Sequence, residues 1–272
     1  MLTRRDVVAL LEAHDLAPSR ALGQNFVVDP NTIRKVVDLA AVAPGEPVVE
    51  IGAGLGSLTT ALAEAGAEVT AVELDKRLVP VLREVVADTS VHIVEADARE
   101  VEWDDLLAGH ERWSLVANLP YNIATPLVAD LLDFVPAIDR MLVMVQREAA
   151  ERLAAPPGSK TYGIPSVKVA YWATAEVVAR VSPNVFLPRP NVESALVRIV
   201  RRRSPATDAD PERLFALVRA GFGQRRKMLR RSLWGLVGPG DFARAGVAPE
   251  SRAEDLDVVA WGRLAGAAAP PS

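Results

Sequence analysis

Short Val- and Ile-rich runs alternate with longer segments of helical period between Val48 and Gln146, and this alternation restricts the fold more than any other feature. The runs are nearly all apolar, as strands buried on both faces of a parallel sheet must be. Strands are predicted over residues 48–51, 68–74, 91–96, 115–118 and 141–145. Helices are predicted near residues 58–64, 76–87, 125–134 and 148–153. The pattern therefore predicts an α/β fold, with a mostly parallel sheet covered by helices on both faces.

The alternation of strand-like and helical segments ends after residue 146. Two further strand-like segments, residues 175–181 and 194–200, bracket a proline-rich loop and predict an antiparallel hairpin at one sheet edge. Residues 204–211 form a polar, proline-containing linker, and the remainder contains only short helical segments. We therefore predict two domains, a large α/β domain over residues 1–203 and a small all-helical domain over residues 204–272.

Composition excludes several kinds of chemistry. The 272 residues include no cysteine, which rules out disulfides, thiolate metal sites and a catalytic thiol, and favours a reducing, cytoplasmic location. The three histidines are scattered without ligand spacing, so no metal site is expected. No apolar run approaches the roughly 18 residues that a spanning helix needs, so no membrane association is expected.

A glycine-rich turn follows the first predicted strand. Gly52, Gly54 and Gly56 are spaced E-x-G-x-G-x-G, and the dinucleotide fingerprint would need a glycine at Ser57, which disfavours a dehydrogenase. Glu73, which ends the second strand, is placed to accept hydrogen bonds from ribose hydroxyls. This combination looks like the S-adenosylmethionine loop of methyltransferases. A glycine turn that merely packs a strand on a helix explains the motif equally well when it is taken alone.

Two further strand ends carry polar candidates. Asp97 follows the third strand and is a candidate acceptor for the adenine amine of the cofactor, although an ordinary helix cap is the alternative. The fourth strand ends in Asn118, Leu119, Pro120 and Tyr121, beside the glycine turn, where open α/β sheets bind ligands. The Asn118 side chain and the Leu119 carbonyl, held rigid by Pro120, are candidate acceptors for an adenine N6 amine. Tyr121 offers a ring on which an extruded base can stack, although turn chemistry and packing are the alternative.

Positive charge is concentrated near the C-terminus. The window from Arg198 to Arg231 contains eleven basic and three acidic residues, a net charge of +8. Because the whole chain carries −4, the remainder carries −12. Such a cluster can bind phosphates by counterion release, so it predicts a nucleic-acid partner, with a solvated basic helix as the alternative.

Taken together, these residues resemble the ribosomal RNA adenine N6,N6-dimethyltransferases, from about Pro18 to Leu264. The resemblance implies a Rossmann-like, class I S-adenosylmethionine-dependent methyltransferase sheet. It implies that a loop at residues 22–27 closes over the cofactor, with contacts from Asn25 and the backbone of Val27. Gly52, Gly54, Glu73, Asp97 and Asn118 are similar to the remaining cofactor positions.

The same resemblance extends to the substrate side. Residues 186–194 resemble the family's F-x-P-x-P-x-V-x-S segment, which implies that Phe186 stacks on the target adenine opposite Tyr121. Residues 222–233 resemble the family's basic helix. This similarity makes five residues candidates for RNA binding: Arg225, Arg226, Lys227, Arg230 and Arg231.

The family has two branches, and the motif around Leu119 resembles the housekeeping one. That branch implies dimethylation of two adjacent adenosines near the 3′ end of small-subunit (16S) ribosomal RNA, in precursor (30S) particles late in assembly, by an enzyme expected to be monomeric. The alternatives are a large-subunit (23S) methyltransferase conferring macrolide resistance and an assembly factor that has lost activity. A small-molecule methyltransferase is disfavoured by the basic C-terminal segment.

Overall fold

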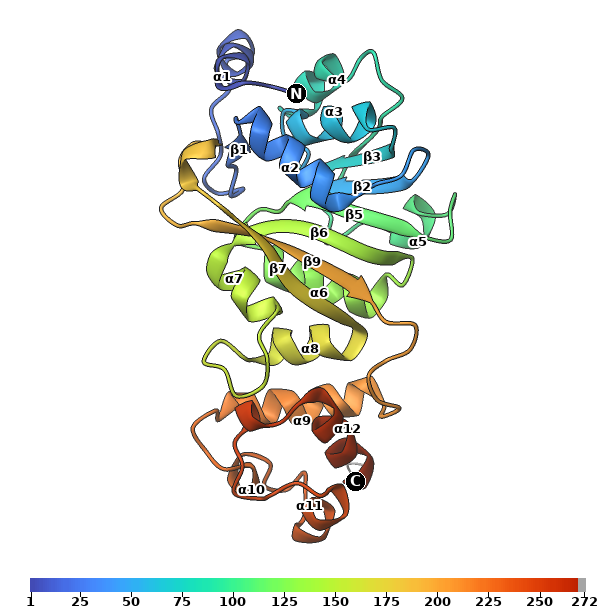
Figure 1. Ribbon diagram of the computed structural model, residues 1–272, viewed down its shortest axis with the longest axis vertical. Helices are drawn as coiled ribbons and strands as arrows, with labels where there is room; N and C mark the ends of the chain where they lie inside the picture. Colours follow the sequence, from blue (N-terminus) through green and yellow to red (C-terminus); the bar gives the residue numbers. More distant parts are fainter. Residues whose placement is uncertain (269–272) are drawn as a thin grey trace. The chain divides into compact units, whose positions relative to one another are not determined.

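The computed structural model describes residues 1–268, which divide into two compact units (Figure 1). The first unit comprises Met1–Ala150 and Glu176–Val200, and the second comprises Glu151–Ala175 and the chain from Arg201 onward. None of the helices within residues 1–268 is both long and apolar enough to cross a membrane. The last four residues of the predicted second domain, 269–272, lie outside the described part.

A seven-stranded sheet forms the centre of the first unit, in the order β4-β3-β2-β5-β6-β9-β7. Strands β2 to β6 pair in parallel, and β9 pairs antiparallel with β6. This confirms the predicted mostly parallel sheet with an antiparallel edge. The strands are β2 (Pro47–Ile51), β3 (Glu68–Glu73), β4 (His92–Glu95), β5 (Trp113–Asn118), β6 (Ile138–Gln146), β7 (Ala173–Val181) and β9 (Ser194–Arg201). All seven predicted strands are thus present, with ends shifted by a few residues.

Helices cover this sheet as the buried strands require. One apolar cluster joins α2 and α3 to alternate residues of the strands, such as Val48, Val116 and Leu142, while their neighbours Val49 and Leu115 are also buried. The helices of this part of the chain are α1 (Arg4–Ala13), α2 (Pro30–Ala40), α3 (Ser57–Glu64), α4 (Val79–Val85), α5 (Trp103–Leu106), α6 (Ala124–Phe134) and α7 (Arg147–Leu153). Helix α4 is shorter than predicted because residues 75–78 form a turn, in which Asp75 accepts the backbone N–H of Arg77.

A second, two-stranded sheet was not predicted from the sequence. It pairs β1 (Phe26–Val27) with β8 (Phe186–Leu187), which follows the short 3-10 helix η1 (Pro183–Val185). Both strands have only two residues, so they carry no periodic pattern of their own. This pairing joins the N-terminal loop to the proline-rich segment, which lies far away in the sequence.

The second unit is mainly helical. It contains α8 (Ile164–Trp172), α9 (Pro211–Gly223), α10 (Leu229–Ser232), α11 (Pro239–Ala245), η2 (Ala253–Asp255) and α12 (Val258–Ala267). Its extent differs from the predicted boundary at residue 203, since it also includes Glu151–Ala175. The physical reason is burial: Tyr162, Val167 and Tyr171 share one apolar cluster with Leu214 and Trp261.

Candidate active site

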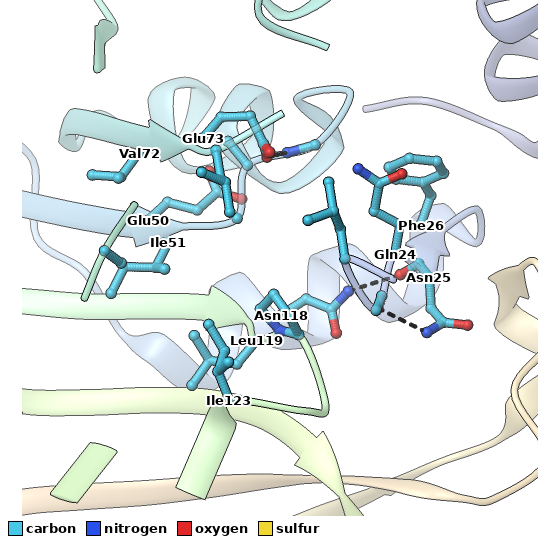
Figure 2. Close-up of a pocket in the computed structure, with 18 of the residues that line it drawn as sticks. Gln24, Asn25, Phe26, Glu50, Ile51, Val72, Glu73, Asn118, Leu119 and Ile123 are labelled. Carbon is cyan, nitrogen blue, oxygen red and sulfur yellow. Dashed lines mark hydrogen bonds between the residues drawn. The ribbon is translucent and has the colours of Figure 1, made fainter. Parts of the chain in front are cut away.

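A cavity of about 220 Å³ lies in the first unit, at the carboxyl ends of β2, β3 and β5 (Figure 2). This is the edge of an open parallel sheet at which ligands bind. Ten of the predicted site residues line the cavity: Asn25, Val27, Gly52, Gly54, Glu73, Asp97, Asn118, Leu119, Pro120 and Tyr121. Residues predicted from five separate segments are therefore brought to one place.

The glycine turn brings bare backbone to this cavity. Gly52, Gly54 and Gly56 have φ values of 75°, 59° and 86°, in the region that side chains disfavour. A Cβ atom at Gly54 would lie 3.0 Å from the ring of Phe26. Gly54 also donates its N–H to Glu73 Oε2 at 2.7 Å, which ties the turn to the end of β3. Backbone conformation thus favours glycine at all three positions, and the space around Gly54 and Gly56 is also too small for a side chain.

Two buried carboxyl groups lie against the turn. Glu73 accepts backbone N–H groups from Gly54 and Asp75, but burial outweighs these bonds and raises its pKa. Glu50, which precedes the turn, is 2% exposed, and burial raises its pKa to about 8. Its Oε2 has no hydrogen-bond partner. Glu50 lines the cavity but was not predicted as a site residue, although the first letter of E-x-G-x-G-x-G marks it.

Asp97 lies at the cavity with an ion-pair partner. Its carboxylate accepts bonds from the Arg99 backbone and guanidinium, and the guanidinium bond is the main cause of its lowered pKa. Asp97 therefore stays ionised and oriented. An adenine amine that bound Asp97 would share this carboxylate with Arg99.

The orientation of the Asn118 amide is fixed by the N-terminal loop. Its Nδ2 donates to the Asn25 carbonyl at 2.9 Å (Figure 2), and Asn25 in turn donates its own Nδ2 to the Gly23 carbonyl. Because the NH₂ group is used, the Oδ1 atom is left as the free end of the amide. That oxygen is buried and has no hydrogen-bond partner, a costly state that an incoming N–H donor relieves.

A second set of hydrogen bonds, made by Gln24, holds the loop that carries Asn25. Gln24 donates its Nε2 to Asp75 at 3.0 Å and accepts the Ser19 N–H with its Oε1. Asp75 follows β3 and is paired with Arg77. Gln24 was not predicted as a functional residue, and no periodic signal marks it. Its bond connects residues 19–25 to the segment after β3, both of which border the cavity.

The two predicted stacking residues have different environments. Tyr121 lines the cavity, and its hydroxyl lies 2.6 Å from the Oγ of buried Ser194. Phe186 is 0% exposed, pairs with Val27 and packs in the apolar cluster that contains Ile33 and Leu196. It is not among the cavity residues. The Phe186 ring thus packs in the apolar core with Leu196 of β9, and its stacking on the target adenine stays a prediction.

The predicted RNA-binding residues lie in the second unit, around α10. Arg225 is paired with Glu254, and Arg230 with Glu250. Arg226, Lys227 and Arg231 are exposed. Two of the five basic groups are thus partly neutralised by neighbours within their own unit, a detail that counting charges in the sequence does not show.

A mostly parallel sheet whose glycine turn and strand-ending carboxylate face one cavity is typical of Rossmann-like nucleotide-binding folds, which include the methyltransferases that use S-adenosylmethionine. Within that class, residues 18–268 match the family described as ribosomal RNA adenine dimethylase. The chain belongs to this family, and its substrate class is ribosomal RNA.

Individual relatives agree with this assignment. The chain is 47% identical to "Ribosomal RNA small subunit methyltransferase A" of Kineococcus radiotolerans, over 97% of this chain and 91% of the relative. It is 46% identical to the protein of the same name from Streptomyces coelicolor, over 97% of this chain and 96% of that one.

Solved structures share the fold. A dimethyladenosine transferase from Plasmodium falciparum is similar with a TM-score of 0.75 at 22% identity, over 87% of this chain and 94% of that chain. The 23S rRNA methyltransferase ErmE is similar with a TM-score of 0.69 at 27% identity, over 89% of this chain and 99% of that chain. The predicted fold class is confirmed.

Proposed function

We propose that this enzyme transfers methyl groups from S-adenosylmethionine to N6 of two adjacent adenosines near the 3′ end of small-subunit ribosomal RNA. Its substrate is the precursor particle late in assembly, and it acts as a monomer in the cytoplasm. Relatives named for the small subunit, 43–47% identical over almost the whole chain, support this choice over large-subunit RNA. The unpartnered Oδ1 of Asn118 is the observation on which the proposed chemistry rests.

The residues of the cavity fit S-adenosylmethionine. The glycine turn leaves room for a ligand against bare backbone, and Glu50 Oε2 is a buried carboxyl oxygen at the cavity without a hydrogen-bond partner, able to bond to a polar group of a ligand. Gly52, Gly54, Asn25 and the backbone of Val27 would hold the cofactor. Glu73 would bind its ribose and Asp97 its adenine amine. The bound cofactor supplies an electrophilic methyl group on a sulfonium.

The protein's own groups prepare the nucleophile. An adenine amine is a weak nucleophile because its lone pair is delocalised into the ring. Asn118 Oδ1 and the Leu119 carbonyl accept hydrogen bonds from the amine protons, two in the first transfer and one in the second, which favours a more pyramidal and reactive nitrogen. After each transfer the nitrogen releases one proton to water. Because Asn25 fixes the Asn118 amide in advance, no reorganisation is needed at the moment of transfer. Tyr121 supports the extruded base from one side.

The test is transfer of radiolabelled methyl groups to small-subunit particles that lack the modification. Asn118→Ala should lower kcat by roughly 100-fold or more, the loss seen when one preorganised hydrogen-bonding group is removed. Asn31→Ala is the matched control, since Asn31 is exposed on α2 and should leave the rate unchanged. Label found only in large-subunit RNA would select the other branch. No label in dimethyladenosine with the unaltered protein would reject the enzymatic function.

A further inference from the structure

The turn that follows α10 exposes a large aromatic side chain. Trp234 is 80% exposed, more than any other large hydrophobic residue within residues 1–268. Its neighbours Met228 and Leu236 are 40% and 44% exposed. An exposed cluster of large apolar side chains marks an interaction site more often than a single exposed residue does. The cluster belongs to the second unit, whereas the cavity residues belong to the first.

Met228, Arg231 and Trp234 are spaced three residues apart around α10, with Met228 as its N-cap and Trp234 just beyond its C-cap. The N–H of Arg231 donates to the Met228 carbonyl at 2.8 Å, and the N–H of Trp234 donates to the Arg231 carbonyl. Residues three apart are neighbours on a helical surface. Arg231 is thus joined through successive backbone hydrogen bonds to residues that carry an exposed thioether and an exposed indole.

Exposed basic side chains without acidic partners lie near Trp234 in the sequence. Arg226, Lys227 and Arg231 are exposed, and within residues 1–268 none of the three has a carboxylate partner. The other basic residues of this segment, Arg225 and Arg230, are paired with glutamates. Unpaired cationic side chains near an exposed ring suit a nucleic acid, because its phosphates are negatively charged and its unpaired bases expose aromatic faces. A purely apolar protein surface would leave these charges uncompensated.

We propose that Trp234 is a stacking site for an unpaired base of RNA, with Arg231 binding an adjacent phosphate. Single-stranded nucleic acids are bound in this way, through aromatic platforms beside positive charge. In double-stranded RNA the base faces are covered by their neighbours, so the ring gains nothing from a duplex. The inference rests on the proposed function, in which this segment binds ribosomal RNA. It adds a residue that contacts a base to a segment otherwise expected to bind only phosphates.

Binding of a fluorescent single-stranded RNA of about 12 nucleotides, compared with a duplex of the same sequence, tests this site. Trp234→Ala should weaken single-strand binding roughly tenfold, Trp234→Phe much less, and duplex binding should not change. Arg231→Gln should lower the slope of log affinity against log salt by about 0.7, whereas Trp234→Ala should leave the slope unaltered. Phe134→Ala is the matched control, because Phe134 is 74% exposed on α6 next to Asp133.

The proposal is overturned if Trp234→Ala binds single-stranded RNA as the unaltered protein does, or if duplex binding falls equally. Self-association that depends on Trp234, seen by sedimentation, would also overturn it and assign the ring to a second copy of the chain. The assay needs no cofactor, so its result is independent of methyl transfer. If the unaltered enzyme methylates small-subunit RNA but Trp234→Ala binds single-stranded RNA as tightly as the unaltered enzyme does, only this inference fails. Equal thermal unfolding midpoints exclude a folding defect.

Discussion

The polar residues of the cavity differ in how many of their side-chain polar atoms already make hydrogen bonds within the protein. Both oxygens of Asp97 bind Arg99, and both oxygens of Glu73 accept backbone N–H groups. Asn118 differs, because its nitrogen is bound and its oxygen is not. The sequence predicts all three residues as hydrogen-bond acceptors at strand ends. Only the hydrogen bonds in the structure show that Asn118 has a free acceptor oxygen, whereas the oxygens of Asp97 and Glu73 already accept bonds from the protein.

Ser194 controls the position of Tyr121 in this arrangement. Its buried Oγ lies 2.6 Å from the tyrosine hydroxyl, and β9 holds it in register with Gln146 of β6. We expect Ser194→Ala to lower kcat/KM for RNA roughly fivefold, the effect of losing one hydrogen bond. Tyr121→Phe should cause a similar loss, and combining the two should add little. Fully additive losses in the double variant would show that the two hydroxyls act independently.

Glu50 makes stability depend on pH in an unusual direction. Burial raises its pKa to about 8, and the neighbouring Glu73 contributes to the rise. Between its ordinary pKa of 4.5 and about 8 the unfolded chain ionises this group while the folded chain keeps it protonated, so rising pH favours unfolding. Compared with Glu50→Gln, the unaltered protein should lose about 2 kcal/mol or more of unfolding free energy between pH 5 and pH 8. Urea unfolding at both pH values measures this difference, and a difference that stays constant with pH would contradict the expected shift.

Among the elements, the turn between β2 and α3 is limited by both sterics and backbone conformation. A Cβ atom at Gly56 would lie 2.8 Å from Leu82 Cδ1 of α4, and the backbone φ there is 86°. Gly45 provides a matched comparison, with φ 74° and no atom within 4 Å of an added Cβ. We expect Gly45→Ala to cost about 1 kcal/mol of unfolding free energy from backbone strain. Gly56→Ala should cost roughly 1–3 kcal/mol more from overpacking, as denaturant unfolding can measure. Equal costs would mean that α4 shifts freely.

The elements that could be predicted are those with their own periodic pattern. All seven strands of the main sheet and four helices follow from apolar runs, whereas α1 and α2 were missed although their caps are present in the sequence. Thr3 and Asp6 form a capping box, and Asp29 with Pro30 begins α2. The β1–β8 pairing carries no local signal, since it depends on contacts between distant residues. Phe186 lies on β8 of this pairing and is fully buried, which the motif at residues 186–194 does not indicate.

For the whole molecule, the division into units cannot be found from composition alone. A linker at residues 204–211 is visible in the sequence, but the second unit is assembled from two separate segments. Tyr162 donates its hydroxyl to the Leu256 carbonyl, and Tyr171 donates to the Ala209 carbonyl, both at 2.9 Å. These contacts join residues 151–175 to the chain beyond Arg201. The domain boundary predicted at residue 203 would place these two segments in different domains.

This organisation predicts how a chain shortened at residue 203 behaves. Such a fragment keeps Tyr162, Val167 and Tyr171 but loses the helices that bury them, so it should bind the dye ANS strongly and aggregate. Val167→Ser then has opposite effects in the two proteins. In the full chain, where Val167 is fully buried, it should cost about 2 kcal/mol of unfolding free energy, whereas in the fragment it should reduce dye binding. A fragment that binds no more ANS than the full chain and unfolds cooperatively would show that residues 151–175 fold with the first unit.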